Sequence, residues 1–540
     1  MTNEQGAVTL SDNLDPAEVR YESLSPFELK NKLISMADSH SEKLMLNAGR
    51  GNPNWVATTP RAGFFELGHF ALQEAERRSI APEFGSTPSR DGCAARFQEY
   101  CRENQSRAGI DFLTAAVNYA TNNLGIAPDE FVGEMVDAIL GDHYPVPDRI
   151  LNCTNQVVSK YLDQEMFGGN PPEGRFDLFA TEGGTAAMAY IFNSLMENKL
   201  LHLGDKIALG SPIFTPYLEI PRLVDYQFVE LEIEQCEDQY WQYPDREIEK
   251  LADPEVKAFF VVHPSNPTSV AMHPDCLEKI GALVRDRRPD LILLTDDVYG
   301  TFVNGFRSLA GVAPRNTILV YSYSKYFGAT GWRLGVIGIH EDNVFDEKIA
   351  ALPEQDRKAL EKRYSRVAFE PAKMKLIERM VADSRAVALH HTAGLSTPQQ
   401  VQMALFSLYC LLDEENQYKA NAQKIVAERI RALYDAIGIS HPNDPYDTHY
   451  YTTIDVPKLA RQRYGDEFTH WFVSNHEPID FVWRLADEKS VVLMDGGGFD
   501  APNMSVRVSL ANLASDAYPR IGKAISDLLD EYHARWESAA

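Results

Sequence analysis

The segment 317–340, TILVYSYSKYFGATGWRLGVIGIH, constrains the fold of this chain more than any other part of the sequence. It begins with a run of β-branched and aromatic residues, which predicts a short buried strand over residues 317–323. The strand ends in Ser322, Ser324 and Lys325. Polar residues directly after a strand are typical of the edge of a parallel α/β sheet at which ligands bind. The segment therefore predicts an α/β fold with a ligand crevice at Lys325.

Arg333 follows this polar cluster within the motif Gly-Trp-Arg-Leu-Gly. Serine hydroxyls and an arginine guanidinium suit a phosphate group, because both donate hydrogen bonds to its oxygens. A lysine beside a phosphate site is what pyridoxal 5'-phosphate (PLP) requires, since the cofactor forms a Schiff base with a lysine amine. The alternative interpretation is a surface lysine that follows a core strand.

The motif Ser-x-Ser-Lys, a short gap and Gly-Trp-Arg-Leu-Gly resembles the cofactor-lysine segment of the fold-type I PLP enzymes, the aspartate aminotransferase group. This resemblance implies a mainly parallel, doubly wound large domain and a smaller α+β domain. It also implies that Lys325 is the catalytic residue that carries PLP, and that Ser322, Ser324 and Arg333 bind the cofactor.

Two further apolar runs, residues 256–262 and 291–294, read as strands joined by a helix, which is the pattern of a parallel βαβ crossover. Asn266 follows the first strand, whereas Asp296 and Tyr299 follow the second. Because parallel strands end at the same edge of a sheet, these side chains are expected in the same crevice as the lysine.

The chemistry of PLP gives each of these residues a role. A carboxylate beside the pyridine nitrogen keeps that nitrogen protonated, and Asp296 fits this role. Asn266 and Tyr299 can donate hydrogen bonds to the phenolic oxygen of the ring. These residues match the Asn-Pro-Thr and Asp-x-x-Tyr motifs of the family, although Ser269 stands where the family usually has a glycine.

Three other segments are candidates for cofactor binding. A Gly183-Gly184-Thr185 turn opens a predicted helix, and helix N-termini bind anions; a capped helix with a glycine turn is the alternative. By resemblance, Phe214 stacks on the pyridine ring, although an ordinary core phenylalanine fits as well. By resemblance, Tyr144 reaches the phosphate of a neighbouring subunit, and a buried tyrosine with a satisfied hydroxyl is the alternative.

The candidate substrate-binding residues are Arg50, Gly51, Asn266 and Arg507. Gly51 lies in a glycine-containing turn that resembles the family's segment over the substrate, although a plain turn is an alternative. Arg507 stands between two strand valines, where an arginine must meet an anion or lie exposed. The resemblance implies that it binds the α-carboxylate of the substrate bidentately. No metal ligand is expected in this site.

The length of 540 residues exceeds what one hydrophobic core supports, so at least two domains are expected. We predict an N-terminal segment, 1–59, that contributes to the small domain, a large PLP-binding domain, 60–395, and a small domain, 396–540. Ordinary aminotransferases are shorter in two regions of this large domain. We therefore predict helical insertions at about 60–143 and 342–390.

The formal net charge of −26 argues against a nucleic-acid-binding surface. The six cysteines form no CxxC pair and read as reduced thiols. The polar N-terminus lacks the apolar region of a signal peptide, and no apolar stretch is long enough to cross a bilayer. The expectation is a cytoplasmic protein without membrane contact.

The length, the insertions and Arg50 together resemble the aspartate 4-decarboxylase branch of this family. That resemblance implies β-decarboxylation of L-aspartate to L-alanine and CO2, with transamination as a side activity. An aspartate or related aminotransferase is the alternative, because the same motifs serve both reactions. A PLP-fold DNA-binding regulator is a remote alternative that would need a helix-turn-helix domain. The resemblance also implies a homo-oligomer, at least a dimer, and for the decarboxylase branch a larger assembly of dimers.

Overall fold

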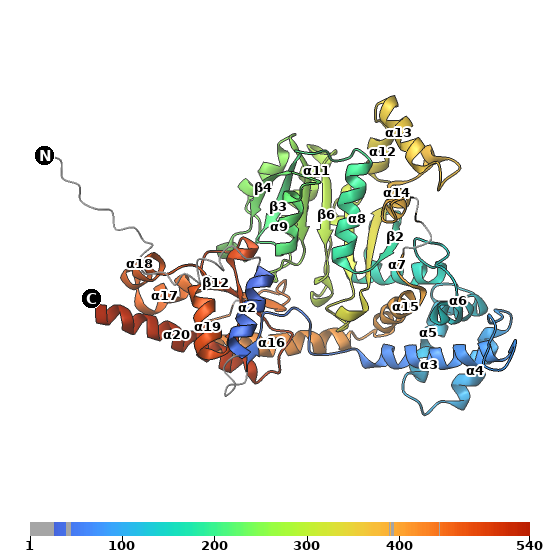
Figure 1. The fold of residues 1–540 in the computed structure, drawn as a ribbon, viewed down its shortest axis with the longest axis horizontal. Coiled ribbons are helices and arrows are strands. Elements are labelled where there is room, and N and C mark those ends of the chain that lie inside the picture. The colour runs from blue at the N-terminus through green and yellow to red at the C-terminus, as the bar shows by residue number, and fades with distance from the viewer. Residues whose placement is uncertain (1–25, 39–44, 388, 390–393, 442, 540) are drawn as a thin grey trace.

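A computed structural model describes residues 26–38, 45–387, 389, 394–441 and 443–539, so the polar N-terminus lies outside the described residues. Figure 1 shows a central sheet flanked by helices, one group of helices that includes α3–α6, and a second group that includes α2 and α16–α20. Among the described residues, no helix combines the length and the apolar composition that a bilayer span requires.

The central sheet has seven strands in the order β2-β8-β7-β6-β5-β3-β4. All neighbouring strands are parallel except that β8 runs antiparallel to both β2 and β7. The prediction of a mainly parallel α/β sheet is therefore confirmed. The strands are β2 (Phe176–Thr181), β3 (Lys206–Ser211), β4 (Val229–Glu234), β5 (Val256–Val262), β6 (Ile292–Asp296), β7 (Thr317–Ser322) and β8 (Gly335–His340).

Side chains that alternate along β5 enter cores on opposite faces of the sheet. Phe259 and Val261 pack with α11 (Pro274–Asp286), whereas Phe260 packs in the core that contains α7 (Asn152–Met166) and α8 (Gly184–Glu197). Both faces are thus covered, as expected for a doubly wound sheet whose central strands β5, β6 and β7 are buried almost throughout. The shorter helices α9 (Thr215–Arg222) and α10 (Asp245–Glu249) lie in the connections around β3 and β4.

The regions predicted as insertions are helical. The first contains α3 (Thr58–Glu76), α4 (Cys93–Glu103), α5 (Ile110–Asn122) and α6 (Pro128–Leu140). The second contains α12 (Val344–Ala350), α13 (Glu354–Tyr364) and α14 (Leu376–Asp383). Helical spacing of apolar residues predicts helices over 63–78, 111–124 and 129–140 in the first region, but not α4, whose buried side chains pack against α6.

The amphipathic pattern of residues 398–437 predicts one long helix that joins the large domain to the small one, and this prediction is wrong. The structure has two helices there, α15 (Thr397–Leu411) and α16 (Gln417–Ile437). Asn416 adopts the left-handed region with φ 53°, and the carboxylate of Asp413 accepts hydrogen bonds from the backbone N–H groups at the start of α16. Both α15 and α16 carry apolar residues at helical spacing, which concealed the polar break between them.

A second core joins the start of the described chain to its end. It unites α2 (Pro26–Asp38) and β1 (Leu46–Asn47) with the C-terminal helices and strands. We propose that this core and the core of the central sheet mark the two domains. The C-terminal elements are β9 (Tyr451–Asp455), α17 (Val456–Tyr464), α18 (Asp466–Asn475), α19 (Asp480–Lys489), β10 (Val491–Val492), β11 (Met494–Asp495), β12 (Ser505–Ser509) and α20 (Ala517–Ala539).

Candidate active site

A cavity of about 510 Å³ lies at the carboxyl edge of the central sheet. The segments after β2, β3, β5, β6 and β7 line one side of it. The other side is lined by α2, the segment after β1, β9 and β12. The predicted convergence of the strand ends is therefore what the structure shows. Asn266, Asp296 and Lys325 all contact this one cavity.

Asp296 is fully buried at the base of the cavity. The hydroxyl of Tyr217 donates a hydrogen bond to its Oδ2 atom at 2.6 Å, and the backbone N–H of Val298 donates to Oδ1 at 3.3 Å. Burial raises the pKa of the Asp296 carboxyl to about 6, although these hydrogen bonds and the charge of Lys325 oppose the shift. The carboxyl group is therefore ionised above about pH 6, and a cation placed beside it would lower its pKa.

Lys325 lies directly after β7, with its Nζ atom 3.2 Å from the carbonyl oxygen of Gly51, which accepts its hydrogen bond. A Cβ atom at Gly51 would lie 3.1 Å from this amine and 2.6 Å from the hydroxyl of Tyr451. Only a glycine therefore lets the backbone pass this close to the lysine. The predicted glycine turn has a steric purpose in the fold.

An anion-binding corner lies beside the amine. The helix α8 begins at Gly184 and points its N-terminus at the cavity, and Gly184 and Thr185 line the wall. Ser322 and Ser324 approach from the end of β7, where the Ser322 hydroxyl donates to the Ser324 hydroxyl at 2.9 Å. Arg333 lines the same corner, and its Nη1 atom donates to the carbonyl oxygen of Thr330 at 2.9 Å.

Gly183 sits behind this corner, at the cap of α8, with φ 95°. A Cβ atom there would lie 2.5 Å from the Nη2 atom of Arg333. Gly183 therefore gives space to the arginine, and it does not itself line the cavity. If the Gly183-Gly184-Thr185 turn served only to cap α8, the exposed guanidinium of Arg333 beside the N-terminus of α8 would have no explanation.

Arg507 is buried on the opposite side of the cavity. Its guanidinium donates to the Oδ1 atom of Asn266 at 3.1 Å and to the carbonyl oxygen of Gly49 at 3.0 Å. It also lies over the ring of Tyr451, 4.2 Å from the centroid. Its Nε atom is buried without a hydrogen-bond partner. A buried guanidinium with an open donor is arranged to receive a carboxylate.

Two further cations stand on this side. Lys30, from α2, and Arg50 line the cavity together with Arg507. Burial and the neighbouring charges of Arg50 and Arg507 lower the pKa of the Lys30 ammonium. Three basic side chains around one space favour a ligand with more than one negative charge.

The remaining predicted residues divide into two groups. Phe214 and Tyr299 line the cavity, and the hydroxyl of Tyr299 donates to the hydroxyl of Tyr451 at 3.0 Å. Tyr144, by contrast, is 70% exposed and is not part of the cavity wall. Its predicted role concerns a neighbouring subunit, so it stays a prediction.

Sequence reasoning missed Lys30, Tyr217 and Tyr451. Lys30 looked like one of several polar residues on an amphipathic helix, and Tyr217 like a residue of a short helix after β3. Tyr451 is the first residue of the short strand β9, where a buried tyrosine is ordinary. Tyr451 could have been found by looking for tyrosines at the ends of predicted strands.

Comparison with known sequences places the chain among enzymes. The sequence pattern of the family "Aminotransferase class I and II" matches residues 178–525. A relative from Pseudomonas sp., named bifunctional aspartate aminotransferase and L-aspartate beta-decarboxylase, is 49% identical over 96% of this chain and 98% of its own. An aspartate aminotransferase from Pyrococcus horikoshii is 28% identical, but over only 28% of this chain and 38% of its own.

Solved structures agree on the fold. The aspartate aminotransferase of Thermus thermophilus with maleate superimposes with a TM-score of 0.54, at 16% identity, over 96% of this chain and 99% of that one. A Pyrococcus protein gives a TM-score of 0.58, at 18% identity, over 97% of this chain and 99% of that one. At such low sequence identity, the similarity to these structures shows the fold alone.

Proposed function

The chain belongs to the class I and II aminotransferase family, and we propose that it uses PLP to convert L-aspartate to L-alanine and CO2, with transamination as a side activity. The choice of a dicarboxylate substrate rests on one observation: three basic side chains, Lys30, Arg50 and Arg507, line the same cavity. A dicarboxylate such as aspartate matches this charge. The near full-length similarity to an enzyme named for both activities supports the reaction.

The side chains of the cavity fit PLP. The anion-binding corner of α8, Ser322, Ser324 and Arg333 would hold the phosphate, and Lys325 would hold the reactive carbon. Asp296 would pair with the pyridine nitrogen. When bound, PLP supplies an electron sink that accepts the electron pair released as a bond of the substrate breaks.

The ring of PLP would meet three more side chains. Phe214 and Tyr217 meet edge to face at 5.3 Å, so one ring can stack on the cofactor while the hydroxyl of the other holds Asp296. Asn266 and Tyr299 are proposed to donate to the phenolic oxygen of the cofactor. A hydroxyl donates only one hydrogen bond, so with PLP bound the hydrogen bond between the two tyrosines would reverse: Tyr451 would donate to Tyr299, and Tyr299 would donate to the cofactor.

Lys325 is the proposed base of the reaction. With PLP and aspartate bound, the Nζ atom of Lys325 would be the base that removes the α-proton of aspartate. The Gly51 carbonyl oxygen lies 3.2 Å from this amine and accepts its hydrogen bond, which directs the Nζ atom toward the substrate side of the cavity. The Asp296 carboxylate would stabilise a protonated pyridine nitrogen when PLP is bound.

Arg507 and Asn266 are proposed to hold the α-carboxylate of the substrate. The guanidinium is buried, so a carboxylate that binds it loses water and gains a charge-assisted pair of hydrogen bonds. Arg50 and Lys30 then face the β-carboxylate. Two roles compete for Arg50: a tight grip would stabilise the ground state and slow loss of CO2, whereas a looser contact would orient the breaking bond.

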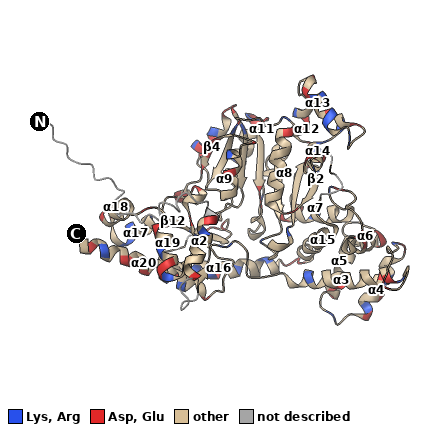
Figure 2. Cartoon of the chain, in the orientation of Figure 1, with Lys and Arg blue, Asp and Glu red and all other residues tan. Residues whose placement is uncertain are grey.

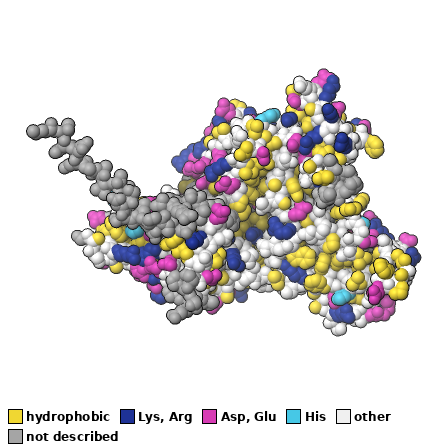
Figure 3. All heavy atoms as spheres, in the orientation of Figure 1, with side chains coloured by type: hydrophobic (Ala, Val, Ile, Leu, Met, Phe, Trp, Pro, Cys, Tyr) yellow, Lys and Arg dark blue, Asp and Glu magenta, His cyan; other side chains and the backbone are white. Residues whose placement is uncertain are grey.

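The proposed assembly is a homo-oligomer, at least a dimer, of a cytoplasmic enzyme. Figure 3 shows hydrophobic side chains at the surface of the region of α3–α6. Phe65, Leu72, Ile80 and Phe84 in this region are each more than half exposed. Such a patch favours contact between subunits. Figure 2 shows acidic and basic residues mixed along the outer helices.

One experiment separates this function from its alternatives. The purified holoenzyme is mixed with L-aspartate without any keto acid, and CO2 and alanine are measured. We expect both products in equal amounts over many turnovers. A pure aminotransferase would stop after one half-reaction per active site, and a regulator without enzymatic activity would produce neither product.

A further inference from the structure

A second cavity, of about 520 Å³, lies where α16 ends and β9 begins. Its lining is strongly acidic, and Lys458 is the one lysine or arginine among its described lining residues. Lys458 is itself paired with Glu237 at 3.0 Å. The acidic lining residues are Glu237, Asp238, Asp444, Asp447 and Asp455. This excess of negative charge favours a cation.

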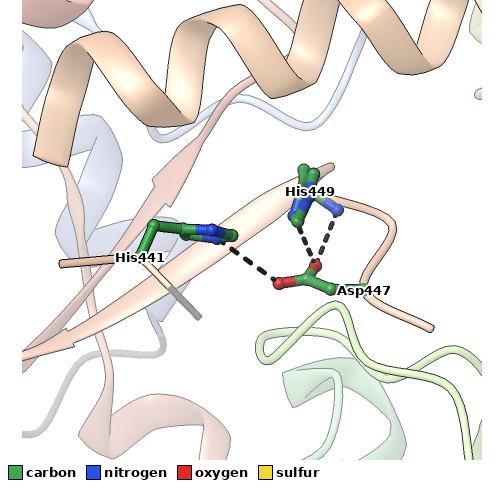
Figure 4. A group of neighbouring side chains, drawn as sticks. All are labelled: His441, Asp447 and His449. Atoms are coloured by element: carbon green, nitrogen blue, oxygen red, sulfur yellow. Dashed lines mark hydrogen bonds and ion pairs between the residues drawn. The ribbon is translucent and has the colours of Figure 1, made fainter. Parts of the chain in front are cut away.

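Two histidines and one aspartate converge beside this cavity (Figure 4). The Nε2 atom of His441 lies 3.8 Å from Oδ2 of Asp447, and the Nδ1 atom of His449 lies 3.1 Å from Oδ1. The carboxylate thus lies between two imidazoles, and all three residues come from the segment between α16 and β9. His449 Nδ1 is buried, and despite this short distance it has no hydrogen bond of acceptable geometry.

We propose that His441, Asp447 and His449 form a binding site for a divalent transition-metal ion of the zinc class. One ligand atom from each residue lies within 4.8 Å of the other two. Zinc bonds of about 2.0–2.2 Å keep tetrahedral ligand atoms roughly 3.3 Å apart. Small side-chain rotations therefore bring the three atoms to the distances that zinc requires.

The chemistry of the ligand set supports zinc over harder cations. Imidazole nitrogen with one carboxylate oxygen suits zinc and its neighbours in the first transition row, whereas magnesium and calcium prefer oxygen ligands alone. The backbone N–H of His449 donates to Oδ1 of Asp447 at 2.7 Å, which orients the carboxylate. The adjoining cavity leaves room for a water molecule as the fourth ligand.

The site is coupled to the active site through Ser269. The backbone N–H of Thr448 donates to the Ser269 carbonyl oxygen at 2.9 Å, and the backbone N–H of Tyr451 donates to the Ser269 hydroxyl at 2.7 Å. A metal ion would tie the end of α16 to the segment that carries Tyr451, which lies against Arg507. The ion is therefore a stabilising element, and it takes no part in the reaction.

The test is a calorimetric titration of ZnCl2 into the holoenzyme in a buffer that does not bind metals. We expect saturable binding of one ion per chain in the wild-type protein. His441→Ala and His449→Ala should each weaken this binding at least about 100-fold, because each removes a ligand. The control is His533→Ala, since His533 is similarly half-buried and has one carboxylate, Glu537, at 3.8 Å.

Absorption spectroscopy with Co²⁺ gives a second measurement of binding that is independent of calorimetry. Co²⁺ in the site should give visible d–d absorption in the wild-type protein and in His533→Ala, and lose it in the two ligand variants. The visible absorption of the bound cofactor reports folding, and Asp447→Asn serves as a nearly isosteric third variant if an alanine variant fails to fold.

The outcomes separate the metal site from a cluster of three ion-paired side chains. Stoichiometric binding that both histidine variants weaken supports the site. Absence of saturable binding, or binding that either histidine variant leaves unchanged, overturns the proposal. An equal loss in His533→Ala would also overturn it, because binding would then depend on histidines in general.

Discussion

The two walls of the active-site cavity are built in different ways. We call the residues after β2, β5, β6 and β7 the cofactor wall, and Lys30, Arg50, Tyr451 and Arg507 the substrate wall. Each residue of the cofactor wall lies within a few positions of a strand end. The substrate wall is assembled from α2, the segment after β1, β9 and β12, which lie far apart in the sequence.

Because the two walls are built differently, substitutions in each wall should affect different properties of the enzyme. Parallel strands fix the cofactor wall as a unit, so its residues keep their mutual geometry. The substrate wall depends on the packing of the second core, in which α2 contacts α19 and β10. We therefore expect changes in the cofactor wall to affect every reaction of the enzyme, and changes in the substrate wall to affect affinity or the choice of product.

Lys325→Ala should have the largest effect. The variant loses the amine that anchors PLP and removes the α-proton, so decarboxylation and transamination should both fall by about 10⁴-fold or more. Alanine and keto-acid formation from aspartate are measured, with Lys358→Ala, an exposed lysine of α13, as the control. Borohydride reduction followed by mass spectrometry should place the cofactor on Lys325. A label on another lysine would remove this residue from its proposed role.

Asp296→Ala should reduce both activities by roughly 10²–10³-fold, because the developing charge loses its buried carboxylate partner. The protein should retain part of its cofactor, since the anion-binding corner is intact. Turnover and the visible spectrum are measured in parallel. Near-normal turnover in this variant would mean that the Asp296 carboxylate does not stabilise the developing charge.

Arg507→Ala tests the substrate wall. Loss of a buried charge-assisted hydrogen bond of about 1.5–3 kcal/mol should weaken binding of aspartate and of alanine alike by roughly 10–100-fold. The spectrum of the bound cofactor should not change. Titration with both amino acids measures the effect, and an unchanged affinity for alanine would assign the α-carboxylate to another residue.

Tyr217→Phe should shift the pH profile. The Tyr217 hydroxyl bonds to the ionised form of Asp296, so it lowers the pKa of that carboxyl, which burial raises to about 6. Without the hydroxyl the pKa should rise by about 1–2 units, the value of one such hydrogen bond. Activity that needs the carboxylate would then be lost at a higher pH as the solution is acidified. The measurement is the acid limb of the profile of kcat/KM against pH. If this limb does not shift in the variant, the Tyr217 hydroxyl does not control the pKa of Asp296.

Arg50→Ala should have the smallest effect on rate and the clearest effect on product. If Arg50 orients the β-carboxylate, the ratio of alanine to keto acid formed from aspartate should fall several-fold, while cofactor binding stays constant. Product analysis by chromatography measures the ratio. A rise in the ratio would instead indicate a grip on the ground state, and no change in ratio or rate would make Arg50 a solvated loop residue.

The sequence by itself determined the fold class and the cofactor wall. The apolar runs that became β5, β6 and β7 have a strand period and end in polar residues, and each pattern is local. Asn266, Asp296, Lys325 and their neighbours could be chosen because a strand end carries its own signal. Gly51 and Arg507 were found from a turn and from a charge within an apolar strand, together with the family resemblance.

Only the tertiary structure decided the rest. Lys30, Tyr217 and Tyr451 enter the cavity because distant elements pack together, and nothing in their own segments distinguishes them from surface or core residues. The break between α15 and α16 and the trio of His441, Asp447 and His449 are local, but apolar periodicity does not report them. The break depends on the hydrogen bonds of the Asp413 carboxylate, and the trio depends on the conformation of the segment between α16 and β9. Periodicity reports which face of an element is buried, whereas long-range packing decides which buried faces meet.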